Sequence, residues 1–405
     1  ENNFKRFKNN IEELDPVYSN ISVEDETKLR FISTYSLNNY KLSYGANLQS
    51  SSYSNNTLFR YYNIDYDTKV DFLKYGVFLK SSKNFLKDKL GVSFGIRLDQ
   101  DTFTKESSLL ENTSPRLALS YILSKDNRWK LNFTVGRYFK IPTYTSLGFK
   151  NFYNQYVNKS SKYTRSDHLV SGIEFNSTQS SRFTFEAFYK TYDNYPVSVI
   201  DGVSLANKGA GFEVLGNEAI FTNGRGNAYG LEFLYQQKLS NNFYGIFSYT
   251  FFYSKFSGLD NKFLPSVWDN RHLLSFTGGY KLKKNWELSA KFRYNYKTPY
   301  APVDLSSSAK AYPEIIFDYS QLGNYYLNDF GKLDIRIDKR WNYKTTSLNF
   351  YIDIENILIS NIPVPPEYGL ERDDNGEVIN PLNLTEVVSE SSSSLIPSIG
   401  IVFDF

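Results

Sequence analysis

The sequence predicts an all-β fold, a transmembrane antiparallel up-and-down β-barrel, from three observations. Segments of about ten residues alternate in polarity over most of the chain, which is the pattern of barrel strands. Aromatic residues make up 18% of the 405 residues, with 34 Tyr and 33 Phe, and these residue types favour strands and bilayer interfaces. Mean hydropathy is only -0.45, and no apolar run approaches the roughly 18 residues of a membrane helix. A barrel strand shows every second residue to lipid, so low hydropathy is compatible with crossing a membrane.

The C-terminal segment shows the alternation most clearly. Its residues divide between two faces because side chains alternate across a strand. One face carries Leu395, Ile399, Ile401, Phe403 and Phe405, and the other carries Ser398, Gly400, Val402 and Asp404. Segments that begin near residues 90, 182, 286, 333 and 347 repeat the pattern. We expect the apolar rows to face lipid.

The opposite rows of these strands carry charged side chains, which we expect to face the barrel lumen. Both signs are present. The predicted lumenal charges are Arg97, Asp99, Arg182, Glu186, Glu232, Lys291, Arg293, Asp334, Arg336, Asp338, Asp353 and Glu355.

The connections alternate in length and thereby orient the barrel. Tight turns are predicted near 36–39, 124–128, 177–181, 239–242, 283–285 and 343–345, and long loops near 51–68, 143–165, 197–226, 254–269, 301–330 and 359–394. Short turns mark the periplasmic side of such barrels. Trp129, Trp286 and Trp341 then fall at the periplasmic ends of their strands, as an aromatic girdle requires. A soluble β-sandwich gives no reason for this sorting.

The strand count indicates an incomplete wall. About 15 strands are predicted, beginning with a descending one near residues 26–36, whereas bacterial single-chain barrels have an even number. We therefore expect an odd number of further strands upstream; a barrel of about 22 would need seven more. Residues 1–405 are predicted to form one outer-membrane barrel domain, without its first strands. Neither an initial Met nor a signal peptide opens the chain.

Composition argues against several other functions. The net charge of +3, from 46 basic and 43 acidic residues, gives no sign of a nucleic-acid partner. Cys is absent, so disulfides, thiolate metal sites and a Cys nucleophile are excluded. No cofactor is indicated.

Metal-binding and catalytic patterns are also missing. His168 and His272 are the only histidines and lie about a hundred residues apart, which suits neither a zinc site nor a Ser-His-Asp triad. The acidic run at 373–377 lacks the spacing of a calcium loop and is interpreted as a turn. Asp334 and Asp338 flank Arg336 on one face, as in a charge ladder rather than an acid-base pair. We predict neither metal binding nor enzymatic activity.

Aromatic residues of the long loops are the candidates for ligand binding, because their rings stack on sugars or chelates. They are Tyr144, Phe149, Phe152, Tyr153, Tyr156, Tyr312, Tyr319, Tyr325 and Tyr326. The alternative is that these rings pack the loops or the girdle. The last long loop combines a Pro-rich stretch at 362–366 with a Ser run at 389–394, and is predicted to act as a lid or a docking surface.

Several short segments stand out at the ends of the predicted strands and in the connections. They are Ser114-Pro115-Arg116-Leu117, Gly136-Arg137-Tyr138-Phe139-Lys140-Ile141-Pro142, Asn207-Lys208-Gly209, Gly230-Leu231-Glu232, Trp268-Asp269-Asn270-Arg271-His272 and Asp353-Ile354-Glu355-Asn356. These segments resemble TonB-dependent receptors, especially those of the Bacteroidota type, over the C-terminal part of their barrel. It is their order along nearly the whole chain, together with the aromatic C-terminus, that carries the resemblance.

The resemblance implies parts that this sequence does not contain. In that family an N-terminal plug fills the barrel, and a segment before the plug binds the TonB complex, which drives import of a scarce ligand. The mixed signs of the lumenal charges suit hydrogen bonding to such a plug better than selection of one ion in an open pore. By position, Phe405 would be the family's barrel-assembly signal, with Phe403 and Ile401 in the same row; the alternative is that all three simply face lipid.

Three functions follow, all in the bacterial outer membrane and in contact with its lipids. The first is import of a large nutrient such as a siderophore, oligosaccharide, peptide or vitamin. The second is a structural subunit of a larger outer-membrane complex, with surface lipoproteins docked on the long loops. The third is a passive porin.

Overall fold

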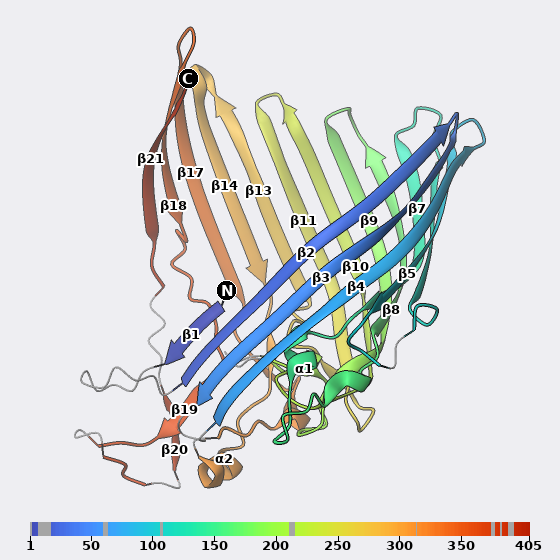
Figure 1. The fold of residues 1–405 in the computed structure, drawn as a ribbon. Helices are drawn as coiled ribbons and strands as arrows, with labels where there is room; N and C mark the ends of the chain where they lie inside the picture. Colours follow the sequence, from blue (N-terminus) through green and yellow to red (C-terminus); the bar gives the residue numbers. More distant parts are fainter. Residues whose placement is uncertain are drawn as a thin grey trace.

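The computed structural model describes residues 2–6, 18–59, 64–105, 108–209, 215–312, 314–373, 377–380, 383–387 and 393–405. Within these ranges one antiparallel sheet holds 17 strands, of which β1 (Asn2–Arg6) and β12 (Phe263–Pro265) are short. The other fifteen run up and down and pair with their neighbours along the chain (Figure 1). The predicted all-β, up-and-down fold and the predicted number of long strands are confirmed.

The long strands have the following bounds. In chain order they are β2 (Tyr18–Leu37), β3 (Tyr40–Phe59), β4 (Ile64–Phe85), β5 (Leu90–Asp101), β6 (Thr113–Ile122), β7 (Trp129–Lys140), β8 (Thr164–Asn176), β9 (Ser181–Ser198), β10 (Ile220–Ser240), β11 (Phe243–Ser257), β13 (His272–Leu282), β14 (Trp286–Asn295), β17 (Phe330–Asn342), β18 (Ser347–Glu355) and β21 (Ile396–Asp404).

Small elements occupy the long loops. They are the helices α1 (Tyr144–Gly148) and α2 (Leu305–Ala311), the 3-10 turns η2 (Asn158–Ser160), η3 (Leu205–Asn207) and η5 (Tyr319–Gln321), and two small two-stranded sheets, β15 (Pro299–Tyr300) with β16 (Tyr325–Tyr326) and β19 (Glu367–Leu370) with β20 (Leu384–Val387). A further 3-10 turn, η4 (Lys283–Asn285), lies between β13 and β14. No helix in the described ranges is both long and apolar enough to cross a membrane.

The sheet curls, so that β2, β3 and β4 pass in front of β9, β10 and β11 in Figure 1. Its outermost pairings in the described residues are β1 with β2 on one side and β18 with β21 on the other. No described pairing joins β21 to β2. The strands therefore form a curved wall around an interior.

Short and long connections separate to opposite ends of this wall, as the sequence predicts. At the short-turn end, β10 and β11 are joined by Asn241 and Asn242, both with positive φ (49° and 67°). Two successive residues with positive φ form the hairpin turn that matches the twist of the strands, and Asn tolerates this conformation best after Gly. The opposite end, with α1 and α2, is the long-loop end.

The predicted loop at 51–68 is instead largely strand, and the last residues of the predicted loop at 197–226 are strand as well. Residues 51–59 and 64–68 continue β3 and β4 in unbroken register, with Ser51 opposite Phe72, and β10 already begins at Ile220. The reason is that strands rising beyond the lipid need no apolar face. Their sequence loses the alternation in polarity while the backbone ladder continues.

Tryptophans mark the outward face at the short-turn end. Trp129, Trp286 and Trp341 are all exposed, at the start of β7, the start of β14 and the end of β17. Trp129 stacks on Phe175 with ring centroids 4.2 Å apart, and Lys339 Nζ lies 5.4 Å from the ring of Trp286. This is the arrangement expected at a membrane interface, where aromatic rings and cationic side chains gather.

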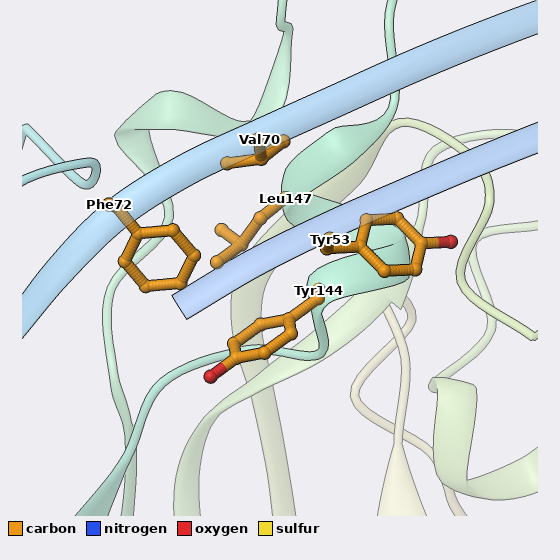
Figure 2. Close-up of a cluster of buried hydrophobic side chains, with 5 residues drawn as sticks. All are labelled: Tyr53, Val70, Phe72, Tyr144 and Leu147. Atoms are coloured by element: carbon orange, nitrogen blue, oxygen red, sulfur yellow. The ribbon is translucent and has the colours of Figure 1, made fainter. Parts of the chain in front are cut away.

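The buried apolar cluster lies at the long-loop end rather than in the middle of the wall. Figure 2 shows Tyr144 and Leu147 of α1 beside Tyr53 of β3 and Val70 and Phe72 of β4. Phe72 is 13 residues from the short-turn end of β4 at Phe85, or about 40 Å along the strand. Because the apolar band of such barrels is about 25 Å tall, this cluster lies beyond it.

Candidate functional site

Several of the predicted lumenal charges form ion pairs in short ladders along the strands. On β5, Arg97 Nε and Nη2 each donate to a carboxylate oxygen of Asp99 at 2.6 Å, and Nη2 also donates to Asn47 Oδ1 of β3 at 2.8 Å. On β17, Arg336 binds Asp338 in the same two-pronged way at 2.9 and 2.8 Å. Paired charges of this kind give a polar surface without a strong field of one sign.

Neighbouring strands extend the second ladder. Asn349 Nδ2 donates to Asp338 Oδ1 at 2.8 Å, and Arg336 lies 3.9 Å from Asp353. Asp334 accepts a hydrogen bond from the backbone N–H of Asn356 at 2.9 Å, and Glu355 pairs with Lys332 at 2.9 Å. These predicted lumenal charges are thus brought together across β17 and β18.

Other predicted lumenal charges are not paired in this way. Arg182 donates to Gln236 Oε1 at 2.9 Å, but Glu186 and Glu232 lie directly opposite each other on β9 and β10. Lys291 is opposite Asp334 in register, and Arg293 is opposite Lys332. In the described part of the chain, Glu186, Glu232, Lys291 and Arg293 have no ion pair within 4.0 Å. These four charged side chains can therefore form ion pairs or hydrogen bonds with another surface.

Tyr144 anchors the loop after β7 to the inner face of β2, β3 and β4. Its hydroxyl donates to Glu26 Oε1 at 2.6 Å and accepts a hydrogen bond from Lys74, which itself pairs with Glu26 at 3.0 Å. Burial and the bond to Glu26 raise the pKa of Tyr144, so the hydroxyl stays protonated and donates. Leu147 is fully buried beside it. The loop is consequently folded inward over the lumen (Figure 2).

Asn158 joins this loop to the next one. Its side-chain amide donates to the carbonyl oxygens of Ser146 at 2.6 Å and Glu218 at 2.8 Å, and its Oδ1 accepts from the backbone N–H of Ile220 at 3.0 Å. The residue is 3% exposed. A buried amide with all these partners fixes two loops that are about sixty residues apart in the chain.

Asn207 makes the corresponding link to a third loop. Its Nδ2 donates to the carbonyls of Leu264 at 3.1 Å and Pro265 at 2.7 Å. The backbone N–H of Val267 donates to Ala206 at 3.1 Å. Residues 143–163, 199–209, 215–219 and 258–271 are therefore one connected structure, which we call the loop layer.

Lys208 is the charged centre of the loop layer. It pairs with Asp201 at 2.5 Å and with Glu218 at 2.9 Å, with little of its side chain exposed. Burial alone would lower the pKa of Lys208, but hydrogen bonds to the two carboxylates outweigh it and the pKa is raised. The Asn207-Lys208-Gly209 segment thus acts within the loop layer as a structural element.

The segment Trp268-Asp269-Asn270-Arg271-His272 is held by its own polar groups. Asp269 Oδ1 accepts from the backbone N–H of Ser254 at 2.9 Å, and Asp269 Oδ2 lies 3.1 Å from Arg271. Burial raises the pKa of Asp269, against the opposing effect of Arg271. Asn270 Nδ2 donates to the carbonyl of Tyr296 at 3.0 Å. The turn is therefore rigid.

The predicted ligand-binding aromatics of the first loop divide into two groups. Tyr144 is 8% exposed, Phe149 stacks on Tyr66 with centroids 6.1 Å apart, and Tyr156 donates to the carbonyl of Lys69, so these three rings pack the loop. Phe152 and Tyr153 are 106% and 83% exposed at the loop tip. These two rings have free surfaces.

The aromatics of the later loop are more accessible. Tyr312, Tyr325 and Tyr326 are exposed, and Tyr319 lies 6.1 Å from the ring of Phe317. They lie around α2 and the small β15–β16 sheet at the long-loop end. The structure does not gather them with Phe152 and Tyr153 into one contact cluster in the described residues.

A cavity that the sequence does not predict lies on the lumenal side of β9, β10 and β11. Its volume is about 330 Å³. It is lined by Phe188, Lys190, Tyr192, Tyr195, Ala228, Glu232, Thr250, Phe252, Ser254, Phe256, Trp268 and Leu273. Aromatic residues occur on both faces of these strands, so the alternation of apolar and polar residues in the sequence does not reveal the site. A usable signal is the row of small lumenal residues on β10, Gly224, Gly226, Ala228 and Gly230.

The histidines and carboxylates do not form a metal centre in the part of the chain that the structure describes. No group of three His, Cys, Asp or Glu side chains there is placed to hold an ion. His168 Nε2 contacts Ser166 Oγ at 2.7 Å on β8, and His272 Nδ1 contacts Tyr249 Oη at 2.8 Å. Both histidines have ordinary wall contacts. Residues 374–376 of the acidic run lie outside the described residues.

The predicted assembly signal lies on the last strand. Ile401 and Phe403 of β21 and the terminal Phe405 are exposed on one row, and the rings of Phe403 and Phe405 lie 6.2 Å apart. This row is available to lipid or to another protein.

Comparison with protein families matches residues 3–357 to the TonB dependent receptor-like β-barrel. No curated protein sequence matches the chain. Among solved structures, the pyoverdine receptor FpvA from Pseudomonas aeruginosa PAO1 bound to pyoverdine has a TM-score of 0.61 at 11% identity, and the match covers 96% of this chain and 53% of that one. The complex of FpvAI with pyocin S2 gives 0.60 at 12% identity, covering 95% and 50%. The copper transporter OprC gives 0.57 at 15% identity, covering 96% and 56%.

These matches support the fold over nearly the whole chain, which spans about half the length of the solved receptors. They confirm the predicted transmembrane barrel architecture and the outer-membrane location. The family consists of receptors and transporters rather than enzymes. Since the family model covers residues 3–357, this chain belongs to the TonB-dependent receptor β-barrel family.

Proposed function

We propose that this chain forms most of the barrel wall and the outer vestibule of a receptor that imports a large nutrient through the outer membrane. The import is driven by the TonB complex, bound through a segment outside residues 1–405. Candidate nutrients are a siderophore, an oligosaccharide, a peptide or a vitamin. Pyoverdine, citrate and copper belong to the solved relatives and are not assigned to this chain.

The observation that carries the proposal is the loop layer joined through Asn158 and Asn207. Buried side-chain amides hold three loops together over the long-loop end, while the short-turn end has only tight turns. Loops fixed in this way form a surface organised before ligand arrives, which reduces the entropy that binding costs. A receptor that captures a scarce ligand from one side needs such a surface.

The lumenal wall supports a plugged rather than an open barrel. Its ladders, such as Arg97 with Asp99, combine both charge signs, and Glu186, Glu232, Lys291 and Arg293 retain hydrogen-bonding capacity toward the interior. A polar plug would satisfy these groups, whereas a passive pore selecting ions of one charge favours a ring of one sign.

Deletion of the gene tests import. The deletion strain is grown on single iron, glycan, peptide and vitamin sources, and uptake is compared with that of a strain with inactive TonB. We expect both strains to lose uptake of the same nutrient. Unchanged uptake of every nutrient would contradict the proposal.

A matched pair of variants tests whether nutrient uptake depends on the loop layer. Asn158→Asp replaces two amide donors with a carboxylate facing the carbonyls of Ser146 and Glu218, and is expected to reduce uptake. Gln155→Ala changes an exposed side chain of the same loop and should leave uptake unchanged. Equal uptake by both variants would show that the loop layer does not contribute to import.

Exposed apolar residues favour a second candidate, a structural subunit of an outer-membrane complex with surface lipoproteins. The last long loop exposes Leu358, Ile359, Ile362 and Val364. Clustered exposed apolar side chains are typical of docking surfaces. Co-purification in mild detergent tests this function: a lipoprotein should be retained by the native protein and lost in Ile362→Asp. If the barrel purifies alone, the candidate fails.

A further inference from the structure

Trp268 differs from the other three tryptophans of the chain. Trp129, Trp286 and Trp341 lie on the outward face at the short-turn end, whereas Trp268 lines the lumenal cavity and is 42% exposed. A large aromatic side chain exposed in a concave site is more informative than one at a membrane interface, because no lipid there accounts for it.

Buried hydrogen bonds hold the exposed indole in place. Trp268 Nε1 donates to Ser254 Oγ at 3.2 Å, and Ser266 Oγ donates to the same oxygen at 2.9 Å. Ser254, Ser266 and Asp269 are all buried, and Asp269 fixes the backbone of Ser254. The indole is therefore a rigid platform, and a rigid aromatic loses little entropy when a ligand stacks on it.

Further aromatic rings form the wall behind this platform. Phe256 lies edge-on to Trp268 with ring centroids 6.0 Å apart, and Tyr195 and Tyr192 lie 4.5 and 5.2 Å from Phe256. The floor is low because β10 contributes Ala228, and its partner in register on β11 is the small residue Ser254. The result is a concave site with one accessible flat ring.

Polar groups complete the cavity. Lys190 and Glu232 both line it, with Thr250 beside them, and in the described residues neither charged group has an ion pair within 4.0 Å. Lys190 Nζ lies 4.8 Å from the ring of Phe188. The site thus offers a donor of hydrogen bonds and an acceptor next to a stacking surface.

We propose that this cavity binds a sugar ring of a glycan nutrient, with Trp268 as the stacking platform. A pyranose has an apolar face of C–H groups, which fits an indole, and hydroxyls at its edge, which both donate to Glu232 and accept from Lys190. A flat aromatic chelator would use the indole, and its oxygens could accept from Lys190, but it would offer no donor to the carboxylate of Glu232. The cavity volume of about 330 Å³ suits one or two rings of a longer chain.

The position of the cavity suits a ligand that arrives from the long-loop end. Tyr192 is 11 residues from the short-turn end of β9 at Ser181, or about 36 Å along the strand. With a strand tilt of about 40°, this places the aromatic wall near the outer boundary of the apolar band. The inference rests on the proposed import function, and it narrows the nutrient to a carbohydrate.

Calorimetry and tryptophan fluorescence on the full-length receptor, purified from outer membranes in detergent, test the site. The probes are maltohexaose, xylohexaose and chitohexaose, with ferric enterobactin as the aromatic chelate. We expect at least one oligosaccharide to bind and to change the emission of Trp268. Trp268→Ala should weaken that binding by about tenfold or more, as for a central aromatic contact.

Controls separate binding from folding. Trp129→Phe changes a lipid-facing tryptophan and should leave the affinity unchanged. Lys190→Met keeps the indole and its hydrogen bonds and should also weaken sugar binding. Each variant is first shown to have the heat-modifiable migration of a folded barrel.

Three results would overturn the inference: no binding of any oligosaccharide, binding that Trp268→Ala leaves intact, or Trp268-dependent binding of the ferric chelate alone. A different result would contradict the import proposal while leaving the sugar site intact. In that case, sugar binding that depends on Trp268 persists while the deletion strain takes up every nutrient normally.

Discussion

The hydroxyl of Tyr144 donates a hydrogen bond to Glu26 over 2.6 Å, joining two residues 118 positions apart in the chain. Glu26 lies on β2 and also accepts from Gln49 of β3 and Lys74 of β4. A single tyrosine therefore fixes the loop after β7 to three strands. Because Leu147 is buried beside it, polar and apolar contacts anchor the same turn of helix.

Removing the Tyr144 hydroxyl should release this loop. Tyr144→Phe keeps the ring against Phe72, whose centroid is 5.3 Å away, but leaves Glu26 and Lys74 without their shared partner. The loss of one partly buried hydrogen bond to a charged group costs about 1.5 kcal/mol, the lower end of the range for such bonds. We expect faster trypsin cleavage at Lys150 and Lys159 on intact cells.

Tyr153→Phe is the matched control, since this ring is exposed at the tip of the same loop. Its cleavage rate should equal that of the native protein. Identical rates in all three proteins would show that the Tyr144 hydroxyl does not hold the loop.

Close packing of β10 against β11 gives a second prediction. A Cβ added at Gly230 would lie 2.2 Å from the backbone oxygen of Phe251 and 2.7 Å from Phe252 Cβ. Since backbone atoms cannot move aside without breaking the ladder, Gly230→Ala should cost about 1–3 kcal/mol. We expect less folded barrel in the outer membrane, measured by heat-modifiable migration.

Gly95 on β5 provides the comparison. A Cβ there would have its nearest neighbour, the backbone oxygen of Leu79, at 3.6 Å, which is ordinary contact. Gly95→Ala should therefore assemble as the native protein does. Equal loss in both variants would indicate a general sensitivity of strand glycines rather than the contact at Gly230.

Local signals made the barrel wall predictable from the sequence. Alternation sets the two faces of β21 and β18, and Asn241 with Asn242 sets a hairpin turn, because strand periodicity and turn conformation depend on adjacent residues. The predicted lumenal charges such as Arg97 and Asp99 follow from the same periodicity. Beyond the lipid the signal fades, which is why the strand residues 51–59 were predicted as loop.

The arrangement of the loops was not predictable in this way. Tyr144 was proposed as a ligand-binding ring, yet it is buried against Phe72, because its environment depends on distant strands. Asn158 and Asn207 have no pattern that marks them, since their partners are backbone carbonyls of other loops. The role of Trp268 depends on Ser254 and on cavity walls from three strands, and none of these is adjacent to it in the sequence.

Lys208 makes the stability of the loop layer depend on pH. Its hydrogen bonds to Asp201 and Glu218 exist only in the folded protein and raise its pKa above the ordinary 10.5. The stability that its charge contributes is fully present below that value, and it is lost as pH rises through the folded pKa.

Replacing Lys208 with Met leaves two carboxylates without their cation and should lower the thermal midpoint by several degrees at pH 8. Native Lys208 loses its own proton only as pH rises through this raised pKa, so the difference between native and variant midpoints should shrink there. Lys162→Met, an exposed lysine of the neighbouring loop, should show little difference at any pH. Thermal unfolding between pH 8 and 11.5 measures both, and a constant gap for Lys208→Met would mean that packing rather than charge is responsible.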